Sequence, residues 1–184
     1  MKIQHNRVLV FDTNIFLLGF DFNVIPGKIY TVPGVLDEIM VERYENKNRT
    51  ILTRIHYAKD IKKLILKEPR EEYINEVKEK ATITNDLKVL SGVDIKLIAL
   101  TLELQDTSKK PVILYTNDYS MENVCSELLI AYSPLKRKGI QKKIFFEFFC
   151  PFCNERKEVT EDICERCGTK IKRRPKSLKN NRST

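Results

Sequence analysis

Two pairs of cysteines near the C-terminus have the spacing of a metal site. Cys150-Pro-Phe-Cys153 is followed after ten residues by Cys164-Glu-Arg-Cys167. Two such pairs can place four thiolates at the corners of a tetrahedron, which is the geometry of zinc in structural sites. Free thiols are the simplest alternative, but two matched pairs argue against them; a rubredoxin-like iron site uses the same ligands and stays open. The fifth cysteine, Cys125, is interpreted as a small buried residue.

A second group consists of four acids, each at the end of a predicted element: Asp12, Glu38, Asp94 and Asp118. Clustered carboxylates repel one another unless a cation lies between them, and Mg²⁺ or Mn²⁺ prefers such oxygen ligands. Metal ions held in this way activate water and stabilise the charge that develops on a phosphodiester. Each acid alone is also interpretable as a helix cap or as a partner of the helix dipole. Asp37 competes with Glu38, because both lie off the apolar face of the same helix.

Strands that end at these acids must position them. Apolar runs typical of buried strands occupy 7–12, 28–32, 111–116 and 129–132. The predicted helices are a short one at 15–18, one beginning at Pro33, and those at 50–66, 71–81, 91–104 and 120–128. Strands alternate with helices and no hairpin signal joins them, so we predict a three-layer α/β/α sandwich around a central parallel sheet. The acids are then expected to converge at the edge formed by the carboxyl ends of the strands.

The formal net charge of +8 over 184 residues is unevenly distributed. Residues 1–132 hold 18 Lys and Arg against 19 Asp and Glu, a net charge of −1. Residues 133–184 hold 15 against 6, a net charge of +9. A basic extension on a near-neutral domain indicates a polyanionic partner, with nucleic acid first and an anionic membrane surface second.

Composition and motifs argue against several other classes. The longest apolar run, 144–150, is too short to cross a bilayer, and residues 1–12 lack a signal-peptide pattern, so we expect a cytoplasmic protein with reduced cysteines. His5 and His56 are the only histidines, and neither has a cysteine nearby, which argues against Ser–His–Asp and Cys–His hydrolases. The chain contains no GxxxxGK[ST] or GxGxxG nucleotide loop.

Four sequence blocks resemble, in order, the acidic blocks of PIN-domain ribonucleases. They are VLVFDTN at 8–14, PGVLDEI at 33–39, SGVDIKLIAL at 91–100 and VILYTNDYS at 112–120. The family pattern places its second acid immediately before an Ile or Leu, which favours Glu38 over Asp37. The resemblance covers roughly residues 7–132, and the ordered set is more specific than any single block.

A narrower resemblance is to the Nob-type endonucleases, which mature the 3′ end of small-subunit ribosomal RNA in archaea and eukaryotes. It is carried by Tyr119-Ser, Gly139-Ile140 and the cysteine pairs, and the lack of large insertions resembles archaeal members. The resemblance implies cleavage of single-stranded precursor rRNA within the pre-small subunit, with Mn²⁺ or Mg²⁺ at the acids and Zn²⁺ at the cysteines. Asn117 departs from the pattern, since many relatives have Asp at that position.

These features predict the domain organisation of the chain. Residues 1–132 form the PIN nuclease domain, 133–149 a basic linker and lead-in strand, 150–168 a zinc ribbon, and 169–184 a basic tail that is disordered when free. The tail is alternatively a solvated extension. The residues predicted to contact RNA are Lys136, Arg137, Lys138, Lys142, Lys143, Lys170, Lys172, Arg173, Arg174 and Lys176. The ribbon phenylalanines 145, 146, 148, 149 and 152 are interpreted either as base-stacking or, more simply, as packing side chains.

Together these features predict a metal-dependent endoribonuclease. Asp12, Glu38, Asp94 and Asp118 hold one or two cations, and the residues that orient these carboxylates are Thr13, Asn14, Thr116 and Asn117. Two alternatives remain. One is a generic or toxin-type PIN ribonuclease that acts on tRNA or mRNA. The other is a non-catalytic RNA-binding assembly factor whose acids have lost their role.

Overall fold

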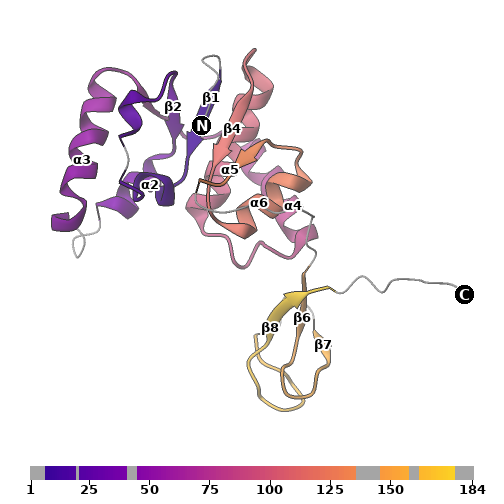
Figure 1. Ribbon diagram of the computed structural model, residues 1–184. Coiled ribbons are helices and arrows are strands. Elements are labelled where there is room, and N and C mark those ends of the chain that lie inside the picture. Colours follow the sequence, from indigo (N-terminus) through magenta and orange to yellow (C-terminus); the bar gives the residue numbers. More distant parts are fainter. Residues whose placement is uncertain (1–6, 20, 41–44, 136–145, 158–161, 177–184) are drawn as a thin grey trace, which may run out of the picture.

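The computed structural model describes residues 7–19, 21–40, 45–135, 146–157 and 162–176, with only the backbone of 45–48. Figure 1 shows a larger α/β part and a small three-stranded sheet beside it. The strands of the larger part are β1 (Val8–Phe11), β2 (Ile29–Thr31), β3 (Leu64–Leu66), β4 (Val112–Tyr115) and β5 (Tyr132–Ser133). Its helices are α1 (Thr13–Phe16), η1 (Phe22–Val24), α2 (Pro33–Ile39), α3 (Glu45–Asp60), α4 (Glu71–Thr84), α5 (Gly92–Thr107) and α6 (Tyr119–Glu127).

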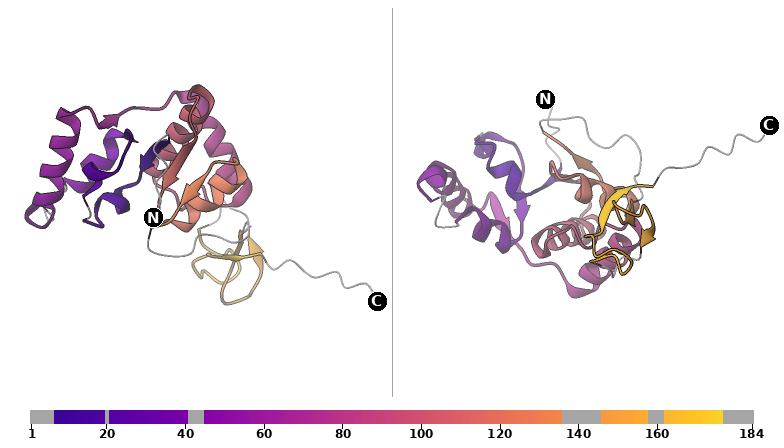
Figure 2. Two further views of the ribbon diagram at one scale, coloured as in Figure 1. Left: turned by 45° about the horizontal axis from the view of Figure 1, so that its top comes forward. Right: turned by 90° about the horizontal axis from the view of Figure 1, so that it is seen from below.

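The five-stranded sheet has the order β3-β2-β1-β4-β5, and every pairing in it is parallel. Helices α4, α5 and α6 pack against one another, and α5 also lies against β1 and β4. Helix α3 packs beside β3 and α2, away from that group (Figures 1 and 2). The predicted α/β/α sandwich with a central parallel sheet is therefore confirmed.

The central strands form because they are buried on both faces. Leu9, Val10 and Phe11 of β1 are almost completely buried, as expected for a strand covered by helices. The ring of Phe11 makes edge-to-face contacts with Phe16 and Tyr115 at centroid distances of 5.7 and 5.5 Å. Such a buried ring contributes about 1.5–3 kcal/mol through its area alone. The end of β1 is thereby rigidly placed, and Asp12 follows it directly.

The predicted helix at 50–66 is wrong in its last part. Helix α3 ends at Asp60, and 64–66 forms β3 beside β2. Lys62 adopts a left-handed φ of 55°, and the N–H of Lys63 bonds the carbonyl of Ala58 at 2.9 Å, which together close the helix. The apolar spacing continues through this turn, so it did not mark the end of the helix.

The small sheet consists of β6 (Phe146–Phe149) between β7 (Arg156–Lys157) and β8 (Lys172–Pro175), all antiparallel (Figure 1). We name residues 146–157 and 162–176 the ribbon. The expected start of a disordered tail at 169 differs from this structure, because 172–175 is an ordered strand. The sequence of this strand, KRRP, has none of the apolar residues from which hydropathy predicts a strand. Cation–π contacts replace apolar packing: Arg173 lies over Phe146 and Arg174 over Phe149, at 3.9 and 4.2 Å.

No helix in the described parts of the chain is long and apolar enough to cross a membrane.

A close approach between α2 and α5 gives a first prediction. A Cβ atom at Gly34 would lie 2.8 Å from Cγ2 of Val93, whereas one at Gly92 would meet no atom within 4 Å. We expect Gly34→Ala to destabilise the protein by about 1–3 kcal/mol through this overlap. The control, Gly92→Ala, should be neutral or stabilising by up to about 1 kcal/mol. Urea unfolding measures both, and a Gly34→Ala protein as stable as the control would contradict the prediction.

Candidate active site and metal centres

Asp12 lies at the carboxyl end of the central strand β1 and is 3% exposed. Its backbone N–H bonds the carbonyl of Tyr115 at 3.2 Å, so it sits against the end of β4. Although it occupies the N-cap position of α1, its side chain makes no capping hydrogen bond to that helix. Instead Oδ2 accepts hydrogen bonds from the hydroxyl of Thr116 at 2.9 Å and from the amide of Asn14 at 3.4 Å. Helix capping therefore does not explain this buried acid.

Burial raises the pKa of Asp12 to about 6, and the nearby carboxylate of Asp94 adds to the rise. The hydrogen bond from Thr116 opposes this effect only in part. A charge buried beside another carboxylate is costly, and a cation between the two would remove that cost. The donor set is all oxygen, which suits Mg²⁺ or Mn²⁺.

Glu38 lies in the last turn of α2, since this helix ends at Ile39. The alternative interpretation of Glu38 as a favourable partner of the helix dipole is therefore wrong, because the dipole disfavours an acid in the last turn of a helix. Helix stability therefore does not account for its position. Glu38 accepts a hydrogen bond from the hydroxyl of Thr13, the residue after Asp12. Asp37 makes no hydrogen bond or ion pair with any described residue, so the contact distinguishes the two neighbouring acids.

Asp94 and Asp118 both cap helices, as their simpler interpretation held. Oδ2 of Asp94 accepts from the N–H of Ser91 at 2.8 Å, and Ser91 Oγ accepts from the N–H of Asp94, which completes a capping box on α5. Oδ1 of Asp118 accepts from the N–H groups of Ser120 at 2.6 Å and Met121 at 3.3 Å at the start of α6. Each cap uses one carboxylate oxygen.

Thr116 joins two of the acids. Its hydroxyl donates to Asp12 and accepts from the N–H of Asp118 at 3.0 Å. The side chain of Asn117 turns elsewhere, because its Oδ1 accepts from the N–H of Leu135 at 3.1 Å. The structure therefore links Asp12 to Glu38 through Thr13 and to Asp118 through Thr116. The acids are not drawn tightly together: among the described residues, only the four cysteines bring three or more ligand atoms within 4.8 Å of one another.

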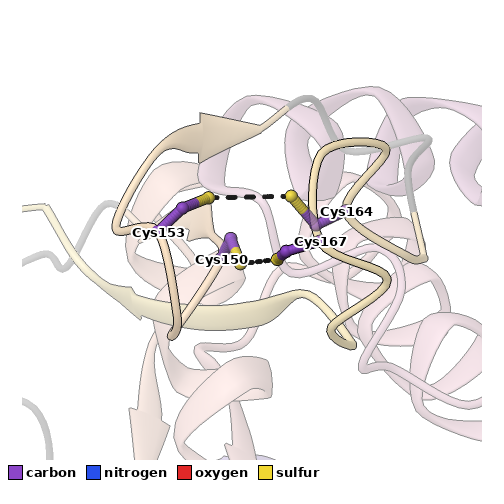
Figure 3. A group of neighbouring side chains, drawn as sticks. All are labelled: Cys150, Cys153, Cys164 and Cys167. Atoms are coloured by element: carbon purple, nitrogen blue, oxygen red, sulfur yellow. Dashed lines mark hydrogen bonds between the residues drawn. The ribbon is translucent and has the colours of Figure 1, made fainter.

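The four cysteines converge from two loops of the ribbon (Figure 3). The sulfur of Cys150 lies 3.4 Å from that of Cys167, and the sulfur of Cys153 lies 3.7 Å from that of Cys164. These distances are too long for disulfides. Thiolates around a tetrahedral zinc with Zn–S bonds of about 2.3 Å would lie about 3.8 Å apart. The cluster thus has the dimensions of a four-sulfur metal site.

Both cysteine loops contain a residue with a left-handed backbone conformation. The residue after each pair, Asn154 or Gly168, adopts a left-handed φ, at 57° and 69°. Burial alone would raise the pKa of Cys150, but hydrogen bonds from the N–H groups of Cys153 and Phe152 lower it to about 6. Backbone donors that stabilise a thiolate prepare it to bind a metal.

The basic residues predicted to contact RNA divide into three sets. Lys170, Lys172 and Lys176 are exposed on the ribbon. Arg173 and Arg174 differ from that expectation, because Arg173 pairs with Asp86 and Arg174 pairs with Glu147, at 2.6 and 2.8 Å. The others, Lys136, Arg137, Lys138, Lys142 and Lys143, lie outside the described residues.

The ribbon phenylalanines also divide by environment. Phe146 and Phe149 pack against the two arginines, whereas Phe152 is 79% exposed between Cys150 and Cys153. Phe148 is half-buried and Phe145 is not described.

The contact between the ribbon and the α/β part was not predicted from the sequence. It involves Asn85 and Asp86, which follow α4, and Asn123 of α6. An Asn-Asp pair after a helix is an ordinary turn signal, so nothing in the pattern distinguished these residues.

A family model, the PIN domain of ribonuclease, matches residues 9–104. Together with the parallel sheet and the acids at its edge, this match shows that the chain belongs to the PIN-domain family of ribonucleases.

Similar proteins extend the relationship beyond that domain. The chain is 33% identical over 170 residues to Endoribonuclease Nob1 of Methanocaldococcus jannaschii, covering 91% of this chain and 78% of the relative. It is 31% identical over 170 residues to Endoribonuclease Nob1 of Pyrococcus abyssi, covering 91% and 94%. For Endoribonuclease Nob1 of Archaeoglobus fulgidus the identity is 32% over 167 residues, covering 89% and 91%. The similarity to this Nob1 group therefore extends past the PIN domain toward the C-terminus.

The buried charge of Asp12 predicts a stability change in the absence of divalent metal. The pKa of Asp12 is higher in the folded chain, about 6, than in the unfolded chain, about 3.9, so stability falls as pH rises between these values. Asp12→Asn avoids the penalty and should be more stable than wild type by about 1–3 kcal/mol at pH 7.5 in chelator. The advantage should nearly vanish at pH 4. Urea unfolding at the two pH values, with Asp37→Asn as an exposed control, measures it; an advantage independent of pH would contradict it.

The cysteine cluster predicts one bound metal ion for each chain. Cys167→Ser should lose this metal and the protection of β6 amides from hydrogen exchange, because the metal supplies the folding energy of so small a sheet. Cys125→Ala is the matched control: Cys125 lies in α6, outside the cluster, and should leave the metal in place. Elemental analysis decides the identity of the ion, and iron instead of zinc would contradict the zinc assignment.

Proposed function

We propose that this protein is a metal-dependent endoribonuclease that cuts precursor small-subunit rRNA at its mature 3′ end. The observation that carries the proposal is Asp12, a buried carboxylate at the end of the central strand that caps no helix. It faces the charge of Asp94 and is linked by Thr13 and Thr116 to two further acids. A divalent cation is the simplest reason to hold so much negative charge at one edge of the sheet.

Asp12, Glu38, Asp94 and Asp118 would hold Mn²⁺ or Mg²⁺. Such a cation supplies an activated water and stabilises charge on the scissile phosphate. The caps at Asp94 and Asp118 each use one carboxylate oxygen, which leaves the other for a cation. Thr116 and Asn14 hold Oδ2 of Asp12 and so orient its carboxylate. Glu38 is oriented by the hydroxyl of Thr13.

RNA binding is assigned to the C-terminal part, which carries a net charge of +9, rather than to the near-neutral PIN domain. Lys170, Lys172 and Lys176 are exposed on the ribbon and can contact phosphates, and Phe152 offers an exposed ring for stacking. In this proposal Zn²⁺ at the four cysteines keeps these residues on one folded surface. The substrate class itself rests on the resemblance to Nob-type endonucleases.

A matched pair of neighbouring acids tests the catalytic assignment. Glu38→Gln should reduce cleavage of a precursor rRNA fragment spanning the mature 3′ end by about 10²-fold or more with Mn²⁺, because it removes a proposed cation ligand. Asp37→Asn, one residue away and exposed, should cut at the wild-type rate. Primer extension maps the cut, and filter binding measures RNA affinity, which neither change should alter.

Three results would contradict the proposal. Equal cutting by both variants would remove Glu38 from the site. Preferential cleavage of tRNA or mRNA would exclude rRNA maturation as the activity. RNA binding without any cleavage, and without Mn²⁺ binding, would favour a non-catalytic assembly factor.

A further inference from the structure

The side chain of Arg173, in strand β8 of the ribbon, extends to the PIN domain and contacts it. Its Nη1 lies 2.6 Å from Oδ1 of Asp86, which is completely buried, and 3.3 Å from the carbonyl of Asn85. The guanidinium also rests on the ring of Phe146, and the Arg173 side chain as a whole is 20% exposed. A paired and stacked arginine at this depth contributes little to an RNA-binding surface. Its contacts are those of a fixed internal joint.

Further bonds surround this pair on both sides. The second oxygen of Asp86 accepts from Nδ2 of Asn123 at 2.6 Å, and Nδ2 of Asn85 donates to the carbonyl of Phe146 at 2.5 Å. The ribbon is thus bonded to the turn after α4, beside which it lies in Figure 1. An exposed ion pair between Lys88 and Asp162 at 3.2 Å adds a weaker link.

The same guanidinium also reaches the first turn of α6. Its Nη2 lies 3.3 Å from Oγ of Ser120, and the N–H of Ser120 bonds Oδ1 of Asp118 at 2.6 Å. Two consecutive contacts therefore lead from a ribbon strand to an acid of the proposed cation site. Asn123, one turn further along α6, holds Asp86 from the other side. The beginning of α6 therefore contacts the ribbon through Arg173 and the turn after α4 through Asp86.

We infer that Arg173 is a positioning residue that couples the folded ribbon to the cation site, by holding the first turn of α6 and with it the carboxylate of Asp118. The inference rests on the proposed function only in treating Asp118 as a cation ligand. It predicts that cation binding at the acids is tighter when the cysteine cluster holds its metal than when that metal is absent, because the metal folds the ribbon that carries Arg173.

Arg173→Gln and Arg174→Gln test this coupling in the full chain. Arg174 is the matched control because its contacts with Glu147, Asn154 and Phe149 all lie within the ribbon. Arg173→Gln should weaken Mn²⁺ binding, measured by electron paramagnetic resonance, about tenfold. It should also speed amide exchange at Ser120 and Met121 at least about fivefold, measured by NMR without Mn²⁺. Arg174→Gln should change neither quantity.

Ser120→Ala separates coupling from simple loss of stability. It retains the pair between Arg173 and Asp86 but removes the hydroxyl that joins Arg173 to α6. Mn²⁺ affinity should fall in this variant while exchange at β6 stays slow and the cysteines keep their metal. Chelation that strips the ribbon metal should reproduce the exchange increase of Arg173→Gln.

Unchanged exchange at Ser120 in Arg173→Gln, or wild-type Mn²⁺ affinity in Ser120→Ala, would overturn the inference. A wild-type protein that binds no Mn²⁺ at the acids would instead overturn the proposed function. The exchange measurements need no divalent metal at the acids, so they would still decide whether the ribbon controls the start of α6.

Discussion

The acid site depends on the parallel pairing of β1 with β4. In this register Phe11 lies beside Tyr115, so the residues that follow the two strands, Asp12 and Thr116, meet at one edge of the sheet. There the hydroxyl of Thr116 donates a hydrogen bond to the carboxylate of Asp12 and accepts one from the backbone N–H of Asp118. Leu9, Val10 and Phe11 of β1 are almost completely buried, so a shift of β1 along β4 would disrupt close packing around all three side chains. The precision of the site comes from this packing.

Two of the four acids serve the fold and the proposed chemistry at once. Asp94 and Asp118 begin α5 and α6, and each gives one carboxylate oxygen to backbone N–H groups. Their positions are therefore favourable even without a cation. Asp12 and Glu38 have no such benefit, since one is buried beside like charge and the other lies at the unfavourable end of a helix dipole. Without a cation, Asp94 and Asp118 thus contribute favourably to the stability of the fold, whereas Asp12 and Glu38 contribute unfavourably.

The predictable parts of the molecule are those that follow a pattern of period or spacing. Apolar runs predicted the central strands, and cysteine spacing predicted the cluster. The strand at 172–175 has no apolar residue, and its stability comes from arginine–aromatic contacts that hydropathy does not record. The sequence Thr-Asn-Asp occurs twice, at 84–86 and 116–118. The copy at 84–86 binds Arg173 of the ribbon, whereas the copy at 116–118 lies at the edge of the sheet where the acids are. The two copies differ because different parts of the chain pack beside them.

The hydrogen bond between Thr116 and Asp12 joins residues 104 positions apart. During synthesis the N-terminal segments emerge first, and Asp12 is exposed long before β4 exists. The acid edge cannot assemble until the strand at 112–115 has emerged and inserted beside β1. The joint to β8 comes later still. The proposed cation site therefore cannot form on a nascent chain until the segment that carries Thr116 and Asp118 has emerged.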